Sequence, residues 1–141
     1  MRLLLAFFSS LLLIAWSSVD SAAYGQSQQQ GAAPTGPAEF LLTSAASDFR
    51  AHRPPYPARF REVRLGYATS PEGTRMYMLC GAFLPASESG SPQWTSFATI
   101  QTSGYEQYLG WQAAAFCDRP SIVWLEGEFS SSLQARLDAL K

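Results

Sequence analysis

The sequence predicts an α+β fold: a small, mainly antiparallel sheet of about four strands, with an N-terminal and a C-terminal helix packed on it and one disulfide. Three observations predict this fold. The run from Met76 to Leu84 has apolar residues on both alternating faces, which is typical of a central strand covered on both sides. Stretches of two-residue period flank this run, and stretches of helical period lie nearer the ends of the chain. The chain also has only two cysteines, Cys80 and Cys117.

Residues 1–23 have the pattern of a cleaved secretory signal peptide. Arg2 forms a short basic region, an apolar region follows, and the segment ends in small residues that suit cleavage after Ala23. The apolar region is shorter than the about 20 residues that a transmembrane helix needs, although an uncleaved anchor is an alternative. We therefore expect a periplasmic or secreted protein without a transmembrane segment after cleavage. The absence of Asn and the single lysine, Lys141, favour a GC-rich bacterial source.

Residues 24–36 are polar, rich in Gly and Gln and nearly uncharged, which predicts a flexible tether. A single α+β domain is expected over residues 37–141. It opens with a helix, because Gly36 can cap it, Pro37 suits its first position and the prolines after Arg53 end it. One face of this helix is apolar, through Leu42, Ala45, Ala46 and Phe49.

Strands are expected next. The alternation from Arg59 to Thr69 predicts a half-buried strand, and the turn at residues 70–74 joins it to the central run in an antiparallel hairpin. The stretch from Trp94 to Thr102 is rich in β-branched and aromatic residues and predicts a third strand.

The C-terminal part is less regular. Residues 105–116 have large side chains at helical spacing and three consecutive alanines, which predicts a short helix on the same side of the sheet as the others. The apolar stretch at 121–125 predicts a fourth strand. Ser131 and Gln134 form a capping-box pattern at the start of a C-terminal amphipathic helix.

Two cysteines in an exported chain predict a disulfide between Cys80 and Cys117. The alternative is a reactive thiol, which needs a nearby base, and neither cysteine has a histidine close in sequence.

The sequence offers little catalytic or metal-binding chemistry. His52 is the only histidine, and it lies at the expected end of a helix, where a cap or a solvated position is typical. Two carboxylates that flank a cleft, such as Glu126 and Glu128, could hydrolyse a glycoside, but carboxylates near a helix start are also simply favourable. We expect no catalytic residue, no metal and no cofactor. The net charge of −1 argues against a nucleic-acid partner.

Arginines gather in the segment from residue 50 to residue 64, where only Glu62 opposes them. Arginine forms bidentate contacts with carboxylate and phosphate, so we take Arg53, Arg59 and Arg61 as candidate binding residues. The alternative is a solvated edge whose arginines pair with acids such as Glu126 and Glu128.

A second candidate surface lies in an aromatic segment flanked by glycines. It combines large rings with polar partners, which suits sugars, peptides or proteins, and its candidate residues are Tyr105, Glu106, Tyr108 and Trp111. In the alternative, these aromatic side chains pack in the core beside the disulfide.

Together these features predict a small exported, disulfide-stabilised envelope protein that acts as a non-enzymatic binding or accessory module. Its expected partner is another envelope protein, or an envelope glycan or lipid headgroup. The first alternative is a periplasmic inhibitor of a hydrolase, with residues 85–92 as the inserted loop. The second is a small carboxylate-dependent hydrolase.

Overall fold

The structure is a computed structural model that describes residues 36–52, 56–86, 91 and 93–140. The predicted signal peptide lies outside the described residues, and so does the predicted tether apart from Gly36. In chain order, the described helices and strands are α1 (Pro37–Ala51), β1 (Pro57–Thr69), β2 (Arg75–Pro85), β3 (Thr95–Gln101), β4 (Tyr105–Leu109), α2 (Trp111–Cys117), β5 (Val123–Trp124) and α3 (Ser130–Ala139).

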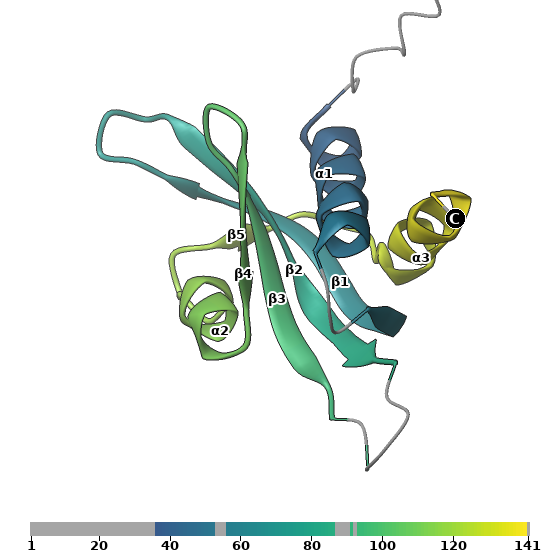
Figure 1. The fold of residues 1–141 in the computed structure, drawn as a ribbon. Helices are drawn as coiled ribbons and strands as arrows, with labels where there is room; N and C mark the ends of the chain where they lie inside the picture. Colours follow the sequence, from purple (N-terminus) through teal and green to yellow (C-terminus); the bar gives the residue numbers. More distant parts are fainter. Residues whose placement is uncertain (1–35, 53–55, 87–90, 92, 141) are drawn as a thin grey trace, which may run out of the picture. The chain divides into compact units, whose positions relative to one another are not determined.

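The strands form one antiparallel sheet in the order β4-β3-β2-β1-β5 (Figure 1). β2 occupies the middle of this order, and its residues Met78, Leu79 and Cys80 are all buried. Neighbouring residues of a strand point to opposite faces, so a buried run without alternation requires cover on both faces. The prediction of a central strand covered on both sides is confirmed.

Each face of the sheet has its own apolar core. On one face, α1 and α3 pack on the first three strands, and this larger core includes Leu41, Phe49, Leu79, Phe97 and Leu133. On the other face, α2 packs on β3 and β4, with Met78, Cys80, Ala98, Ile100 and Ala113 in a smaller core. Figure 1 shows α2 on the opposite side of the sheet from α1 and α3. The expectation that all helices lie on one side was therefore wrong for α2.

The predicted N-terminal helix and hairpin are confirmed. α1 has Gly36 as its N-cap and Pro37 as its first residue, and the predicted apolar face is buried. The turn between β1 and β2 closes through a hydrogen bond from Ser70 N–H to Thr74 O of 2.8 Å. Gly73 takes a positive φ of 87° in this turn, which explains the glycine.

The expected helix over residues 105–116 was wrong in its first half, where β4 adds a strand to the four that were predicted. Residues 105–109 complete the ladder of β3, and Gly110, with a φ of 62°, separates this strand from α2. The spacing of the large side chains fits both structures, and pairing with β3 decided between them.

Two smaller corrections concern the C-terminal part. The expected strand at 121–125 is reduced to Val123–Trp124. The capping box was also wrong, because α3 begins at Ser130, one residue before the expected cap, and its N-cap Phe129 has no capping side chain. Instead, Ser130 N–H donates to Glu128 Oε1 at 3.1 Å, so the carboxylate ahead of the helix supplies the acceptor.

Candidate functional site

A β-bulge in β1 determines which side chains reach the α2 face of the sheet. Arg61 lies opposite Ala82 and Arg64 lies opposite Cys80, so two residues of β1 face the single residue Gly81. Glu62, inside the bulge, has a positive φ of 55°. Because side chains alternate along a regular strand, Arg61 and Arg64 would point to opposite faces without the bulge. The inserted residue places both on the face that carries α2 and the disulfide.

The bulge fits closely against its neighbours. A Cβ on Gly81 would lie 2.9 Å from side-chain carbons of both Val63 and Phe97, so only glycine leaves the required space. On the outer side of β1, Val63 N–H donates to Glu128 Oε1 at 3.0 Å and to Ser130 Oγ at 3.2 Å. The Glu128 carboxylate thus takes the place of a strand partner and satisfies the backbone at the bulge.

Two arginine–tryptophan stacks stand on this face. The guanidinium carbon of Arg61 lies 4.3 Å from the centre of the Trp94 ring, and that of Arg64 lies 4.7 Å from Trp124. Such cation–π contacts contribute about 0.5–1 kcal/mol each at exposed sites. Stacking uses the flat face of a guanidinium and leaves the N–H donors at its edge free for an anion. We call these four residues the arginine–tryptophan face.

A pocket of about 440 Å³ opens beside Arg64 and Trp124. Ser96 and the disulfide also line it, and the carboxylates of Glu62 and Asp118 stand at its wall. Glu62 and Asp118 are both exposed, as is Arg64. The pocket therefore presents a cation, two anions, a hydroxyl and an aromatic ring to solvent, which is a surface suited to a ligand of mixed charge.

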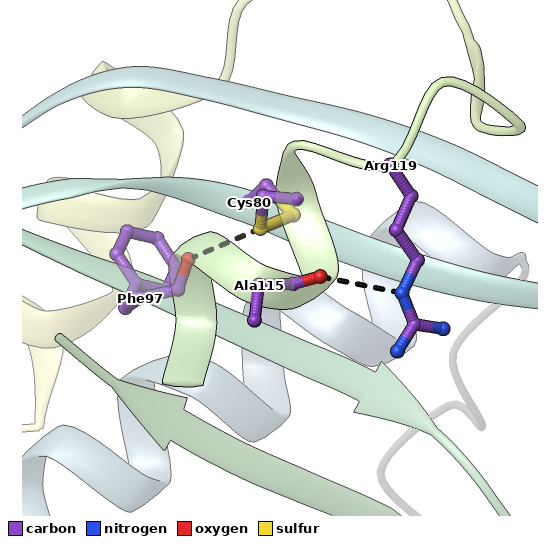
Figure 2. The surroundings of a disulfide bond; sticks show 5 residues. Cys80, Phe97, Ala115 and Arg119 are labelled. Carbon is purple, nitrogen blue, oxygen red and sulfur yellow. Dashed lines mark hydrogen bonds between the residues drawn. A yellow bond between two sulfur atoms is a disulfide. The ribbon is translucent and has the colours of Figure 1, made fainter. Parts of the chain in front are cut away.

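The disulfide joins Cys80 of β2 to Cys117 at the end of α2, with a Cα–Cα distance of 6.0 Å, and the prediction is confirmed. Figure 2 shows the bridge against the Phe97 carbonyl, whose oxygen lies 3.8 Å from Cys117 Sγ. Beyond it, Arg119 Nε donates to Ala115 O at 3.2 Å (Figure 2). α2 buries fully only Ala113, and Phe116 and Cys117 are partly buried against the smaller core, so the covalent link adds to a modest noncovalent contact with the sheet.

Of the three predicted basic site residues, only Arg61 lies on the arginine–tryptophan face. Arg53 lies outside the described residues. Arg59 is exposed opposite Leu84 and also borders a shallow hollow beside α3. Arg61 belongs to the arginine–tryptophan face. The ion pairs among the described residues join His52 to Asp48 and Arg136 to Glu39, so none involves the arginines of β1 or the acids Glu126 and Glu128.

The predicted aromatic residues do not form one platform. Tyr105 points to the α1 side, where its hydroxyl donates to Asp48 Oδ1 at 3.3 Å. Tyr108 points to the opposite face, packs on Phe116 with ring centres 4.6 Å apart, and donates its hydroxyl hydrogen bond to Glu106. Trp111, the first residue of α2, is 79% exposed. The two tyrosines are therefore separated by the thickness of the sheet.

The pKa values of Tyr105 and Tyr108 are raised above the ordinary value for tyrosine. Burial, and then the charge of Asp48, raise the pKa of Tyr105. The hydrogen bond to Glu106 is the main cause that raises the pKa of Tyr108. Both hydroxyls therefore act as neutral hydrogen-bond donors near pH 7.

His52 follows α1 and caps it. Its backbone N–H donates to Asp48 O at 3.0 Å, and its Nδ1 lies 3.2 Å from Asp48 Oδ1. No group of three His, Cys, Asp or Glu side chains within the described part of the chain is arranged to hold a metal ion.

Sequence reasoning placed Arg64 in the basic segment without taking it as a site residue, and it missed Trp94 and Trp124. Trp94 directly precedes β3, and Trp124 is the last residue of β5. Such a position at the end of a strand suggests contact with a neighbouring strand but does not identify that strand. The pairing of each tryptophan with its arginine depends on the register of β1.

Comparison with known proteins finds no matching family model, no matching curated protein and no matching solved structure. Among the described helices, none combines the length and apolar character needed to span a membrane.

Proposed function

We propose that this chain is a small exported, non-enzymatic binding module of the bacterial envelope, and that it binds a carboxylate-bearing peptide segment of another envelope protein on the arginine–tryptophan face. The observation that carries the proposal is the pair of stacks, Arg61 on Trp94 and Arg64 on Trp124. Each stack holds a flexible cation in place before binding, so a ligand loses less side-chain entropy on contact.

The pocket favours a peptide over a phosphate. Arg61 and Arg64 can bind a carboxylate through paired N–H donors. Glu62 and Asp118, at the pocket wall, would repel a doubly charged phosphate but accept hydrogen bonds from an ammonium or amide group. A peptide segment with an acidic and a basic group side by side can bind the two arginines through its carboxylate and the two carboxylates through its ammonium group.

Two further features support a binding role in an exported protein. Disulfides persist mainly in oxidising compartments, and both cysteines of this one line the pocket. The carboxylates Glu62 and Asp118 are exposed. A hydrolytic general acid is usually kept protonated by burial, so their exposure favours recognition over catalysis. Much of the 85–92 loop of the inhibitor alternative lies outside the described residues, and no specific observation favours that role.

An NMR titration tests the proposal with two defined probes, N-acetyl-glutamyl-lysine amide and inorganic phosphate. The dipeptide should shift the indole N–H signals of Trp94 and Trp124 saturably, with a Kd of about 1 mM for so small a probe. Phosphate should have a much weaker effect, and added salt should weaken dipeptide binding.

The control uses a third stacked arginine. Arg75 lies 4.5 Å from the Tyr67 ring, and both residues lie away from the pocket. Arg61→Gln and Arg64→Gln should each weaken dipeptide binding, whereas Arg75→Gln should leave it unchanged. Absence of any saturable shift, or equal weakening by all three substitutions, would reject the arginine–tryptophan face as a binding site. N-terminal sequencing of the exported chain tests the export step and should find cleavage after Ala23.

A further inference from the structure

The outer edge of β4 is open. At its two ends, Gly110 N–H donates to Ser96 O at 2.8 Å, and Thr102 N–H donates to Gly104 O at 3.0 Å. Backbone groups alternate in direction along an antiparallel strand, so the even-numbered residues of β4 bond to β3. The backbone groups that point away from the sheet are those of Tyr105, Gln107 and Leu109.

This short edge carries one charged side chain, Glu106, but lacks other common protections against an added strand. Natural sheets cover an exposed edge or place Pro or Lys on it, and β4 contains neither residue. α1 and α2 pack on the faces of β4 and, among the described residues, no further strand pairs with its edge. The side chains along it are unusually exposed for apolar residues, at 36% for Tyr105, 38% for Leu109 and 79% for the adjacent Trp111.

We infer that β4 pairs with β4 of a second copy of this chain, antiparallel about Gln107, to form a symmetric dimer with one continuous sheet. In this register every outward N–H and C=O of the three outward-facing residues meets a partner. Tyr105 lies opposite the partner's Leu109, which pairs two exposed apolar side chains. Glu106 lies opposite the partner's Tyr108, so a carboxylate faces a hydroxyl and no like charges meet.

Gln107 gives a second, independent indication. Its Oε1 accepts a hydrogen bond from the Thr99 hydroxyl at 2.6 Å, whereas its Nε2 is buried and has no hydrogen-bond partner among the residues that the structure describes. An unpaired buried donor is destabilising, so such groups normally have a partner. On the two-fold axis of the dimer, a turn of the Gln107 side chain out of its covered position would bring its amide against that of the partner's Gln107, which supplies an acceptor oxygen. The self-complementary edge therefore favours a second copy over an unrelated strand.

Sedimentation velocity of the exported chain, with its disulfide intact, tests the dimer over about 1–300 µM, where strand-edge dimers of micromolar Kd would dissociate on dilution. The wild-type chain should pass from monomer to dimer. Leu109→Lys should stay monomeric, because it places a charge at the paired edge. Leu125→Lys is the matched control, since Leu125 is 37% exposed at a site remote from β4, and it should dimerise like the wild type.

Cysteine crosslinking tests the register and does not depend on whether Leu109→Lys folds. Facing residues of a hydrogen-bonded pair have Cα atoms about 5.5 Å apart, within the range of a disulfide. Gln107→Cys should therefore oxidise to a covalent dimer. Tyr105→Cys should not, because its two copies would lie about 14 Å apart along the strands. A wild-type chain that stays monomeric throughout overturns the proposal, even if another protein occupies the edge. A dimer that persists in Leu109→Lys without the Gln107→Cys crosslink also overturns it. The outcome is independent of the arginine–tryptophan face, which lies on other strands.

Discussion

Removal of the disulfide should loosen α2 from the sheet while leaving α1 in place. The bond spans a sequence separation of 37 residues, for which the chain-entropy relation predicts a loss of about 3.8 kcal/mol in the free energy of unfolding. α2 is the element most affected, since Ala113 is its only fully buried residue. For a domain of this size, the loss corresponds to a drop in melting temperature of roughly 15 °C.

The assay compares the wild-type chain with the Cys80→Ala, Cys117→Ala double variant. Circular dichroism gives the melting temperature, and native-state hydrogen exchange gives the protection of individual amides. The amides of α2 should lose the most protection, through local opening, whereas those of α1 should lose no more than the change in the global free energy of unfolding. A reducing agent should lower the melting temperature of the wild type and leave that of the double variant unchanged. A drop of less than about 3 °C, or α2 amides as protected as those of α1, would refute the reasoning that α2 depends on the covalent link to stay on the sheet.

Three further predictions concern the packing of β1 and the edge of β4. Gly66→Ala should lower the free energy of unfolding by about 1–3 kcal/mol, because a Cβ there would lie 2.7 Å from a side-chain carbon. A Cβ on Gly104 would have nothing within 4 Å, so Gly104→Ala should lower it far less. Urea unfolding of both variants measures the difference. Glu128→Ala should cost about 1–3 kcal/mol, because Val63 N–H loses the nearer of its two acceptors and Ser130 N–H loses the Glu128 carboxylate, whereas Glu126→Ala should be nearly neutral; equal effects in thermal melts would contradict this role. Burial and a nearby carboxylate raise the pKa of Tyr105 above its ordinary value of about 10. Because the folded state holds this proton more tightly, the protonated tyrosine stabilises the fold below about pH 10. This stabilisation is lost as the pH rises through the pKa of the folded state. The urea concentration at the unfolding midpoint should therefore fall at alkaline pH, and Tyr105→Phe should remove the part of this fall that is due to Tyr105.

Local patterns in the sequence were sufficient for several elements. The apolar face and proline signals of α1, the turn between β1 and β2, and the two-sided apolar character of β2 each depend on residues close together in the chain. The disulfide followed from cysteine number and the expected export, and the structure confirms it. The signal peptide and tether remain predictions, because they lie outside the described residues apart from Gly36.

The tertiary structure decided the identity of the candidate site. Arg61 was a candidate because arginines are dense in its segment. Arg64 lies on the same face only because the extra residue at the bulge shifts the alternation of side chains along β1 by one residue. Trp94 and Trp124 contact these arginines from segments that lie far from β1 in the sequence.

The same holds for residues 105–109. Their pattern of large side chains fits a helix as well as a strand, and the unpaired edge of β3 favoured the strand by accepting its backbone hydrogen bonds. Strand register and strand partners depend on contacts between distant segments, because one residue of slip moves every side chain to the opposite face. Periodicity within a single segment therefore predicts that a strand exists, whereas the pairing of segments determines which side chains meet.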